Sequence, residues 1–351
     1  MMTVPCSKFH LKIILTLAIF LLAGVSKISS QNRKHSKPGL YYFKNKAGKI
    51  GVENEKGTVI IPAEFSEIGN HITNKLIEGP LIEFFGARKG FNNPKSPVIP
   101  GAEVFDRRGR FLYYVQWFDN GPDYYSEGLR RINKNGKIGF ANAEGDIVIE
   151  PKYDWTHPFN YGYTKVIIGD VSRHYEDDEH WTLALGKNSK SFYINKKGEK
   201  VEPNKTRQSP KDLDIGGEFL PYPFVYNSAE KEMADYLNGL EVLNKIYRTT
   251  IDNEEPKENF KIQFEMTEKP RKNFPYYVFQ GYHNMQHEDA MVFAASKDGK
   301  LFYHLSWDGE LMRLHQWVIK ELENCRDYFK RFPGKPFQFD TEKELKIWRK
   351  K

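Results

Sequence analysis

The alternation of apolar and polar positions changes period along this chain, and the change divides it into two parts. From Leu40 onward, short runs of β-branched or aromatic residues alternate with glycine-containing turns, as in residues 59–61, 111–115 and 147–149. Runs of this kind, bounded by turn residues, are typical of β-strands. We therefore expect residues 40–203 to form an all-β domain.

Two segments of this domain repeat each other. Residues 45–52 (Asn-Lys-Ala-Gly-Lys-Ile-Gly-Val) return 88 residues later as 133–140 (Asn-Lys-Asn-Gly-Lys-Ile-Gly-Phe). Each copy is followed by a further glycine and by an apolar run that ends at Pro62 or Pro151. Such self-similarity predicts a repeat array of stacked hairpins. We expect its turns and close backbone approaches at Gly48, Gly51, Gly57, Gly128, Gly136, Gly139, Gly145 and Pro151.

The pattern after residue 216 predicts a different architecture. Asn227 with Glu230 makes a capping box, and an apolar stripe with helical spacing follows from Met233 to Tyr247. Later helices are expected from about Leu311 to Phe332 and from Thr341. Between the first two helices, strands are expected over residues 260–266, 276–282, 290–295 and 301–306. Residues 217–351 therefore read as an α+β domain, an antiparallel meander flanked by helices. The polar residues 204–216 are the predicted linker.

The first thirty residues are expected to be a signal peptide. Lys8 and Lys12 precede the apolar run from Ile13 to Val25, and small polar residues that include Ser26 and Ser30 follow. The run is too short to cross a bilayer comfortably, which favours a cleaved signal over an uncleaved anchor. Cleavage is expected after Ser30, with Ser26 as the alternative. Residues 31–39 form a polar leader. This predicts an exported protein, periplasmic, cell-envelope or extracellular, with no stable transmembrane segment after cleavage.

Composition and charge narrow the functional classes. The chain has 53 basic and 46 acidic residues, but the two signs are interspersed rather than gathered on one face. We therefore expect no nucleic-acid partner. Cleavage of the signal leaves Cys325 as the single cysteine, which excludes an intrachain disulfide and a cysteine metal cluster.

The repeated motif is similar to a known family. Glu127-Gly128-Leu129, residues 136–140, Gly145, Ile149, residues 151–154 and Phe159 together resemble the bacterial WG β-repeat family. Residues 40–69 match it as well, and residues 100–127 and 181–203 are degenerate matches. The chain has isoleucine, at Ile50 and Ile138, where the family has an aromatic residue before the second glycine. The resemblance implies a scaffold or binding surface without a common catalytic residue, and it does not extend to residues 217–351.

Several clusters could carry chemistry, and each has a simpler interpretation. His283 and His287 could ligate zinc if they lay on a helix, but their position between two expected strands favours a hairpin loop. Cys325 lies on an apolar helical stripe, which favours core packing over a nucleophile. The acidic run 176–179 lacks the spacing of a calcium loop. We therefore expect no cofactor and no catalytic residue.

Aromatic residues give the strongest indication of binding. They make up 15% of the chain, and many lie in or beside the repeats. Rigid aromatic side chains either fill the space between stacked hairpins or form a platform for a ligand. The candidate binding residues are Trp117, Tyr125 and Trp155. The function that we expect is an exported cell-envelope repeat protein that binds a protein partner. A glycan-binding module is the alternative, and a hydrolase around His283, His287 and His304 is the second.

Overall fold

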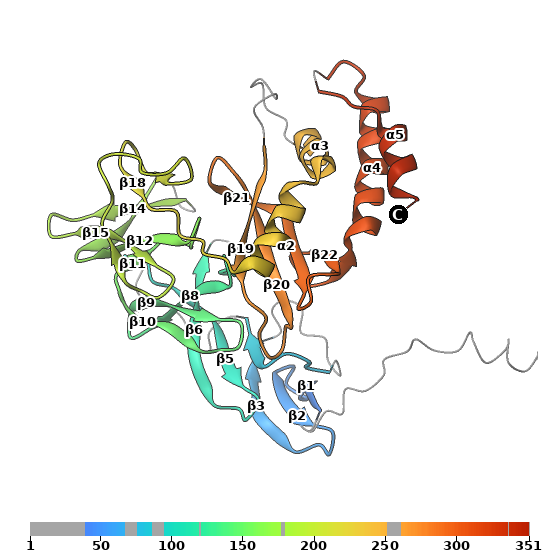
Figure 1. The fold of residues 1–351 in the computed structure, drawn as a ribbon. Helices are drawn as coiled ribbons and strands as arrows, with labels where there is room; N and C mark the ends of the chain where they lie inside the picture. Colours follow the sequence, from blue (N-terminus) through green and yellow to red (C-terminus); the bar gives the residue numbers. More distant parts are fainter. Residues whose placement is uncertain are drawn as a thin grey trace, which may run out of the picture.

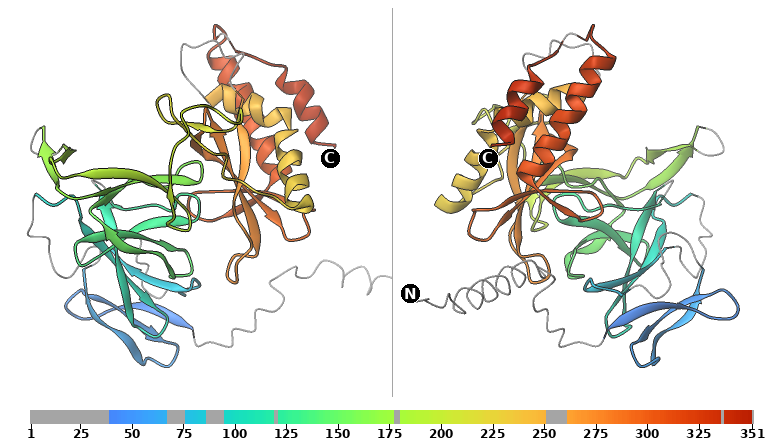
Figure 2. Two further views of the ribbon diagram at one scale, coloured as in Figure 1. Left: turned by 60° about the vertical axis from the view of Figure 1, so that its left-hand side comes forward. Right: turned by 90° about the vertical axis from the view of Figure 1, so that its right-hand side faces the viewer.

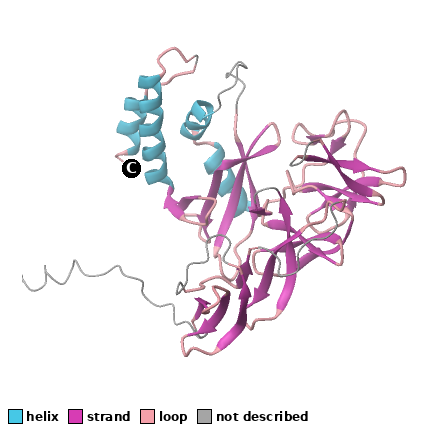
Figure 3. Cartoon of the chain, turned by 180° about the vertical axis from the view of Figure 1, so that it is seen from behind, coloured by secondary structure: helices cyan, strands magenta, loops and turns pink. Residues whose placement is uncertain are grey.

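The structure, a computed structural model, is β-rich in its N-terminal part and carries helices in its C-terminal part (Figures 1 and 3). It describes residues 39–66, 76–85, 95–118, 121–176, 180–250, 261–335 and 337–350. The expected signal peptide, residues 1–30, and most of the polar leader lie outside the described residues. The fold class predicted from the sequence, a β-repeat array followed by an α+β domain, is confirmed.

The repeat domain begins with an antiparallel meander. Its strands are β1 (Leu40–Lys44), β2 (Ile50–Asn54) and β3 (Val59–Phe65). A larger antiparallel sheet follows, with the strand order β10-β9-β8-β6-β5-β4 and with β7 paired to β6. Its strands are β4 (Leu81–Phe84), β5 (Pro100–Asp106), β6 (Phe111–Phe118), β7 (Gly121–Pro122), β8 (Leu129–Lys134), β9 (Lys137–Asn142) and β10 (Ile147–Tyr153).

The remaining strands of the repeat region lie in small antiparallel sheets. One has the order β11-β12-β15-β16 and another joins β13 to β14. Their strands are β11 (Trp155–Thr156), β12 (Tyr163–Ile168), β13 (Val171–Tyr175), β14 (Trp181–Leu185), β15 (Lys190–Asn195) and β16 (Lys200–Val201). In the segment expected to be the linker, β17 (Leu213–Asp214) pairs with β18 (Phe219–Leu220), and Leu213 is buried.

The sequence repeat is also a repeat of strand register. In the first copy Val52 pairs with Ile61 and Ile50 with Phe65. In the second copy Phe140 pairs with Ile149 and Ile138 with Tyr153, all four positions being shifted by 88 residues. Both pairs of strands carry a register shift between the two pairings. The two copies therefore share a bulged hairpin as well as a sequence.

The C-terminal domain is a meander covered by helices. Its sheet has the order β19-β20-β21-β22-β23. The strands are β19 (Gln263–Glu268), β20 (Tyr276–His283), β21 (Gln286–Ser296), β22 (Phe302–Leu305) and β23 (Leu311–Arg313), and the helices are α2 (Ser228–Asn238), α3 (Glu241–Thr250), α4 (Leu314–Arg331) and α5 (Thr341–Trp348). Apolar residues of all these helices pack against one face of the sheet in a single core. Figures 1 and 2 show the sheet between the helices and the repeat domain.

Two helix boundaries differ from those expected. The apolar stripe from Met233 to Tyr247 forms α2 and α3 rather than one helix, because the chain breaks at Gly239. There the Asn238 side chain exchanges two hydrogen bonds with the backbone of Phe264, at 2.9 Å each, and this tertiary contact fixes the end of α2. Helix α4 begins at Leu314 instead of Leu311, because β23 pairs with β22. The predicted capping box of Asn227 and Glu230 is confirmed.

Candidate functional site

The repeat glycines fall into two structural classes. Gly48, Gly57, Gly128, Gly136 and Gly145 have φ angles between 73° and 92°, a region that favours glycine. Gly51 and Gly139 have ordinary φ angles but face a neighbouring backbone. A Cβ on Gly139 would lie 2.3 Å from the Ile149 carbonyl oxygen and 2.5 Å from the Pro151 nitrogen. The equivalent Cβ on Gly51 would lie 2.6 Å from the Ile61 carbonyl oxygen. These residues build the scaffold that positions the aromatic side chains.

Two of the candidate binding residues pack inside the repeat domain. Trp155 is 6% exposed and its ring centroid lies 5.9 Å from that of Trp181 and 6.1 Å from that of Phe118. Trp117 is half-buried and covers Gly101, where an added Cβ would lie 2.3 Å from the indole ring. The core-filling interpretation of the aromatic residues therefore describes Trp155, which offers no open ring face to a ligand.

Tyr125 is placed differently, at the surface above the ion pair of Arg130 and the half-buried Glu83. Its side chain is 38% exposed, and the Arg130 guanidinium lies 4.6 Å from the centroid of its ring. Arg130 donates from both terminal nitrogens to the Glu83 carboxylate, so the cation is held in place. Burial of the hydroxyl end raises the pKa of Tyr125, an effect that the Arg130 charge partly offsets. The neighbouring Tyr124 is 79% exposed.

A second group of aromatic residues lies on the C-terminal sheet. The ring centroids of Phe274 and Tyr276 are 5.1 Å apart, and those of Tyr276 and Tyr303 are 5.5 Å apart. Arginine side chains flank these rings, with Arg271 lying 5.1 Å from Phe274 and Arg313 lying 4.9 Å from Tyr303. All five side chains are half-buried or exposed. Phe302 and His304, the neighbours of Tyr303 along β22, pack on the helix side, so Tyr303 faces away from the helices.

Glu144, in the turn between β9 and β10, joins the repeat domain to this second group. It pairs with Arg271 at 3.3 Å and accepts a hydrogen bond from Asn273. We call the set Arg271, Phe274, Tyr276, Tyr303 and Arg313 the aromatic–arginine band. The sequence does not single out these residues, because they become neighbours through strand pairing.

The histidines of the candidate hydrolase site are held by separate partners. His283 and His287 flank the turn between β20 and β21, which confirms the predicted hairpin. The His283 ring lies 5.7 Å from that of Tyr247. His304 stacks on Trp317 with 4.7 Å between ring centroids, and burial lowers its pKa. Among the described residues no group of three or more His, Cys, Asp or Glu side chains could hold a metal ion.

Cys325 lies where its apolar stripe predicted it, in a hydrophobic core. Cys325 is 4% exposed within the core of the C-terminal domain, and burial raises the pKa of its thiol to about 11. A thiol with that pKa is protonated near neutral pH, which makes it a poor nucleophile. In the acidic run, residues 177–179 lie outside the described residues.

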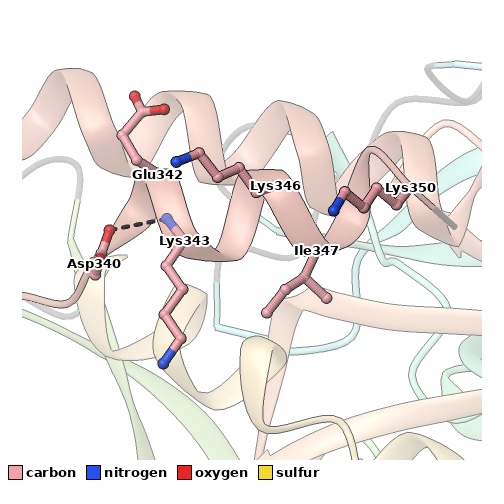
Figure 4. Close-up of a pocket in the computed structure, with 6 residues that line it drawn as sticks. All are labelled: Asp340, Glu342, Lys343, Lys346, Ile347 and Lys350. Carbon is pink, nitrogen blue, oxygen red and sulfur yellow. Dashed lines mark hydrogen bonds between the residues drawn. The ribbon is translucent and has the colours of Figure 1, made fainter.

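Two depressions of the described surface are lined mainly by side chains of the helices and of the turn between β21 and β22. One, of about 420 Å³, follows α5 and is lined by Asp340, Glu342, Lys343, Lys346, Ile347 and Lys350. Figure 4 shows these side chains spread along the helix without converging on one point. No helix among the described residues is long and apolar enough to cross a membrane.

A comparison with known proteins identifies the repeats. Residues 44–71 and 138–171 match the family model described as WG containing repeat. No curated protein matches the chain. A solved structure, "Crystal structure of the eukaryotic initiation factor", is 10% identical over 79% of this chain and 95% of the other, with a TM-score of 0.15, which carries no argument about fold or function. The chain therefore contains WG-type repeats at residues 44–71 and 138–171, within its β-rich N-terminal part.

Proposed function

We propose that the protein is an exported, non-enzymatic binding protein of the cell envelope that presents the aromatic–arginine band to a protein partner. The observation that carries the proposal is the band itself. Tyrosine and arginine are enriched among the residues that contribute most to binding at protein interfaces. The rings of Phe274, Tyr276 and Tyr303 are already held in contact, so binding would order few further side-chain torsions.

The exported location is supported by the sequence alone. The basic start, the apolar run from Ile13 to Val25 and the serine-containing end have the arrangement of a signal peptide. The resemblance to WG-type repeats implies a scaffold or binding surface, and this is consistent with a binding role outside the cytoplasm.

A glycan ligand is less well supported than a protein partner. Sugar rings stack best on flat aromatic faces, but Phe274 and Tyr276 are inclined by 57° and Tyr276 and Tyr303 by 74°. The side chains therefore form an uneven apolar ridge rather than a flat platform. Such a ridge fits the irregular side-chain surface of a protein.

Site-specific photocrosslinking in cells tests the proposal. A benzoylphenylalanine at position 303 should form an adduct with a discrete partner protein, and Arg313→Ala should abolish the adduct. Binding of the purified partner should weaken by about 10- to 1,000-fold on Tyr303→Ala, as expected for a hot-spot residue. The control position is 332, where Phe332 is 43% exposed and lies at the end of α4, outside the band.

The outcomes separate the alternatives. Arg313→Lys keeps the charge but loses the planar guanidinium, so it should recover only part of the affinity. Equal adducts at positions 303 and 332 would contradict the band as the site. Binding to polysaccharide that depends on Tyr303, without a protein adduct, would favour the glycan alternative.

A further inference from the structure

Two turns of the repeat domain, 34 residues apart, have the same conformation. In the first, Ser126 and Leu129 exchange backbone hydrogen bonds of 2.8 and 3.1 Å around Glu127 and Gly128. In the second, Asn160 and Tyr163 exchange bonds of the same lengths around Tyr161 and Gly162. The central residues have φ angles of 52° and 80° in the first turn and 51° and 77° in the second. Positive φ at both central positions defines the two-residue turn that suits the twist of a hairpin.

The first turn holds the second. The Ser126 hydroxyl donates to the Phe159 carbonyl oxygen, immediately before the second turn. The Gly162 N–H donates to both carboxylate oxygens of Glu127, at 3.1 and 2.9 Å. Glu127 is 5% exposed, so this contact is shielded from water. Successive repeats are therefore joined turn to turn.

The second turn contacts a hairpin of the C-terminal domain through the first residue of the turn, as the first turn contacts the second. Asn160 occupies the position of Ser126, and its side-chain amide donates to the Met285 carbonyl oxygen at 2.8 Å. The His287 N–H donates to the Asn160 side-chain oxygen at 3.0 Å. Asn284 and Met285, the central residues of this hairpin, have φ angles of 47° and 62°. A third turn of the same type thus follows the first two, but it comes from the other domain.

Further contacts join the repeat domain to the C-terminal domain near the third turn. Tyr282, next to the third turn, donates its hydroxyl hydrogen to the Glu127 carboxylate, and its ring packs edge-on against Tyr161 with 5.2 Å between centroids. Lys196 extends from the turn between β15 and β16 and donates to the carbonyl oxygens of Glu127 and Thr267, at 2.5 and 2.7 Å. Burial lowers the pKa of the Lys196 ammonium, which the nearby Glu127 partly counteracts.

We infer that the C-terminal domain is the terminal cap of the repeat array, and that the hairpin of β20 and β21 occupies the place of a following repeat's turn. Arrays of stacked repeats need an atypical terminal unit, because the last repeat would otherwise expose the surface that its neighbour buries. In this role, which is separate from ligand binding, the C-terminal domain covers the last repeat, and the segment 283–287 is its docking element.

Hydrogen exchange of the full-length protein tests the inference. Asn160→Ala removes the side-chain contacts with the hairpin, so exchange in the segment 283–288 should accelerate by about tenfold or more. The control is Asn54→Ala, which removes a comparable asparagine whose side chain accepts from the backbone of Lys56 and Thr58 in the first hairpin of the repeat domain. That variant should leave exchange in segment 283–288 unchanged.

A double substitution in the hairpin turn tests whether this turn is equivalent to a repeat turn. Replacing Asn284 by Glu and Met285 by Gly gives the hairpin the turn residues of the first repeat turn. If the hairpin replaces a repeat turn, this double variant should keep the slow exchange of segment 283–288. Unchanged exchange in Asn160→Ala would overturn the inference, as would a turn exchange that releases the hairpin as fully as Asn160→Ala does.

Discussion

Single residues decide where the backbones of the repeats can approach each other. Gly139 is required by space, because β10 passes directly over the position of its missing Cβ. Gly136, three residues earlier, is required by its φ angle of 73°, with nothing within 4 Å of an added Cβ. Glycine is therefore required at the two positions of one short motif for different physical reasons, and substitutions should distinguish the two requirements.

Gly139→Ala should destabilise the repeat domain by roughly 1–3 kcal/mol or more, because the added Cβ meets backbone atoms of β10 that cannot rotate away. The loss should appear as a lower denaturant midpoint in equilibrium unfolding. Gly121→Ala is the matched control, because it has open space around its Cβ and an ordinary φ angle. The control should stay within about 0.5 kcal/mol of the parent protein. Equal stability of the two variants would contradict the close approach of β9 and β10.

Tertiary contacts set two helix boundaries in the C-terminal domain. Helix α2 ends where Asn238 bonds to the backbone of Phe264, and α4 starts after Arg313 has paired in β23. The start of α2 is instead fixed locally. The Asn227 side chain accepts from the Glu230 N–H at 2.9 Å, and the Glu230 carboxylate accepts from the Asn227 N–H at 3.0 Å.

Asn227→Ala should destabilise the C-terminal domain by about 0.5–2 kcal/mol, since one donor at the start of α2 loses its acceptor. Thermal unfolding followed by far-ultraviolet circular dichroism would show a lower midpoint. Ser228→Ala, one position later, leaves the capping box intact and serves as the control. A midpoint that falls as far for Ser228→Ala would mean that the cap contributes nothing specific.

At the scale of the whole molecule, the pKa values of two carboxylates are lowered in the folded state. Burial acts to raise the pKa of Asp212, but the N–H groups of Ser209, Gln208 and Tyr222 lower it by more. Burial likewise acts to raise the pKa of Glu230, and the Lys269 ammonium and the Asn227 N–H lower it by more. Asp212 joins the segment 208–209 to Tyr222 and so orders the region between the two domains. The domain boundary at 204–216 stays a prediction.

Stability should fall on acidification. Because the pKa values of Asp212 and Glu230 are lowered in the folded state, their contribution is present above the unfolded values of about 4 and is lost as the pH drops through the folded values. The thermal midpoint should therefore be lower at pH 3 than at pH 7. Asp212→Asn should lower the midpoint at pH 7 and flatten its dependence on pH. A midpoint that stays constant between pH 7 and pH 3 would contradict these assignments.

The sequence predicted what depends on local chemistry. Periodicity separated the strand-rich repeats from the helical part, the capping box placed the start of α2, and the repeated glycines marked turns and close backbone approaches of the array. The sequence also placed His283 and His287 in a hairpin. These features depend on residues close together in the chain, whose conformational preferences act before any tertiary contact forms.

The tertiary structure alone decided which side chains meet across the chain. Trp155 and Tyr125 look equivalent in the sequence, but packing against Phe118 and Trp181 buries one, while the other stays half-open above Arg130. The contacts of Tyr276 with Tyr303, and of Asn160 with Met285, join positions far apart in the chain. Their proximity follows from strand pairing and domain docking, which depend on the burial of the whole molecule. Local sequence therefore determined the repeats and turns, whereas the band and the cap required the complete fold.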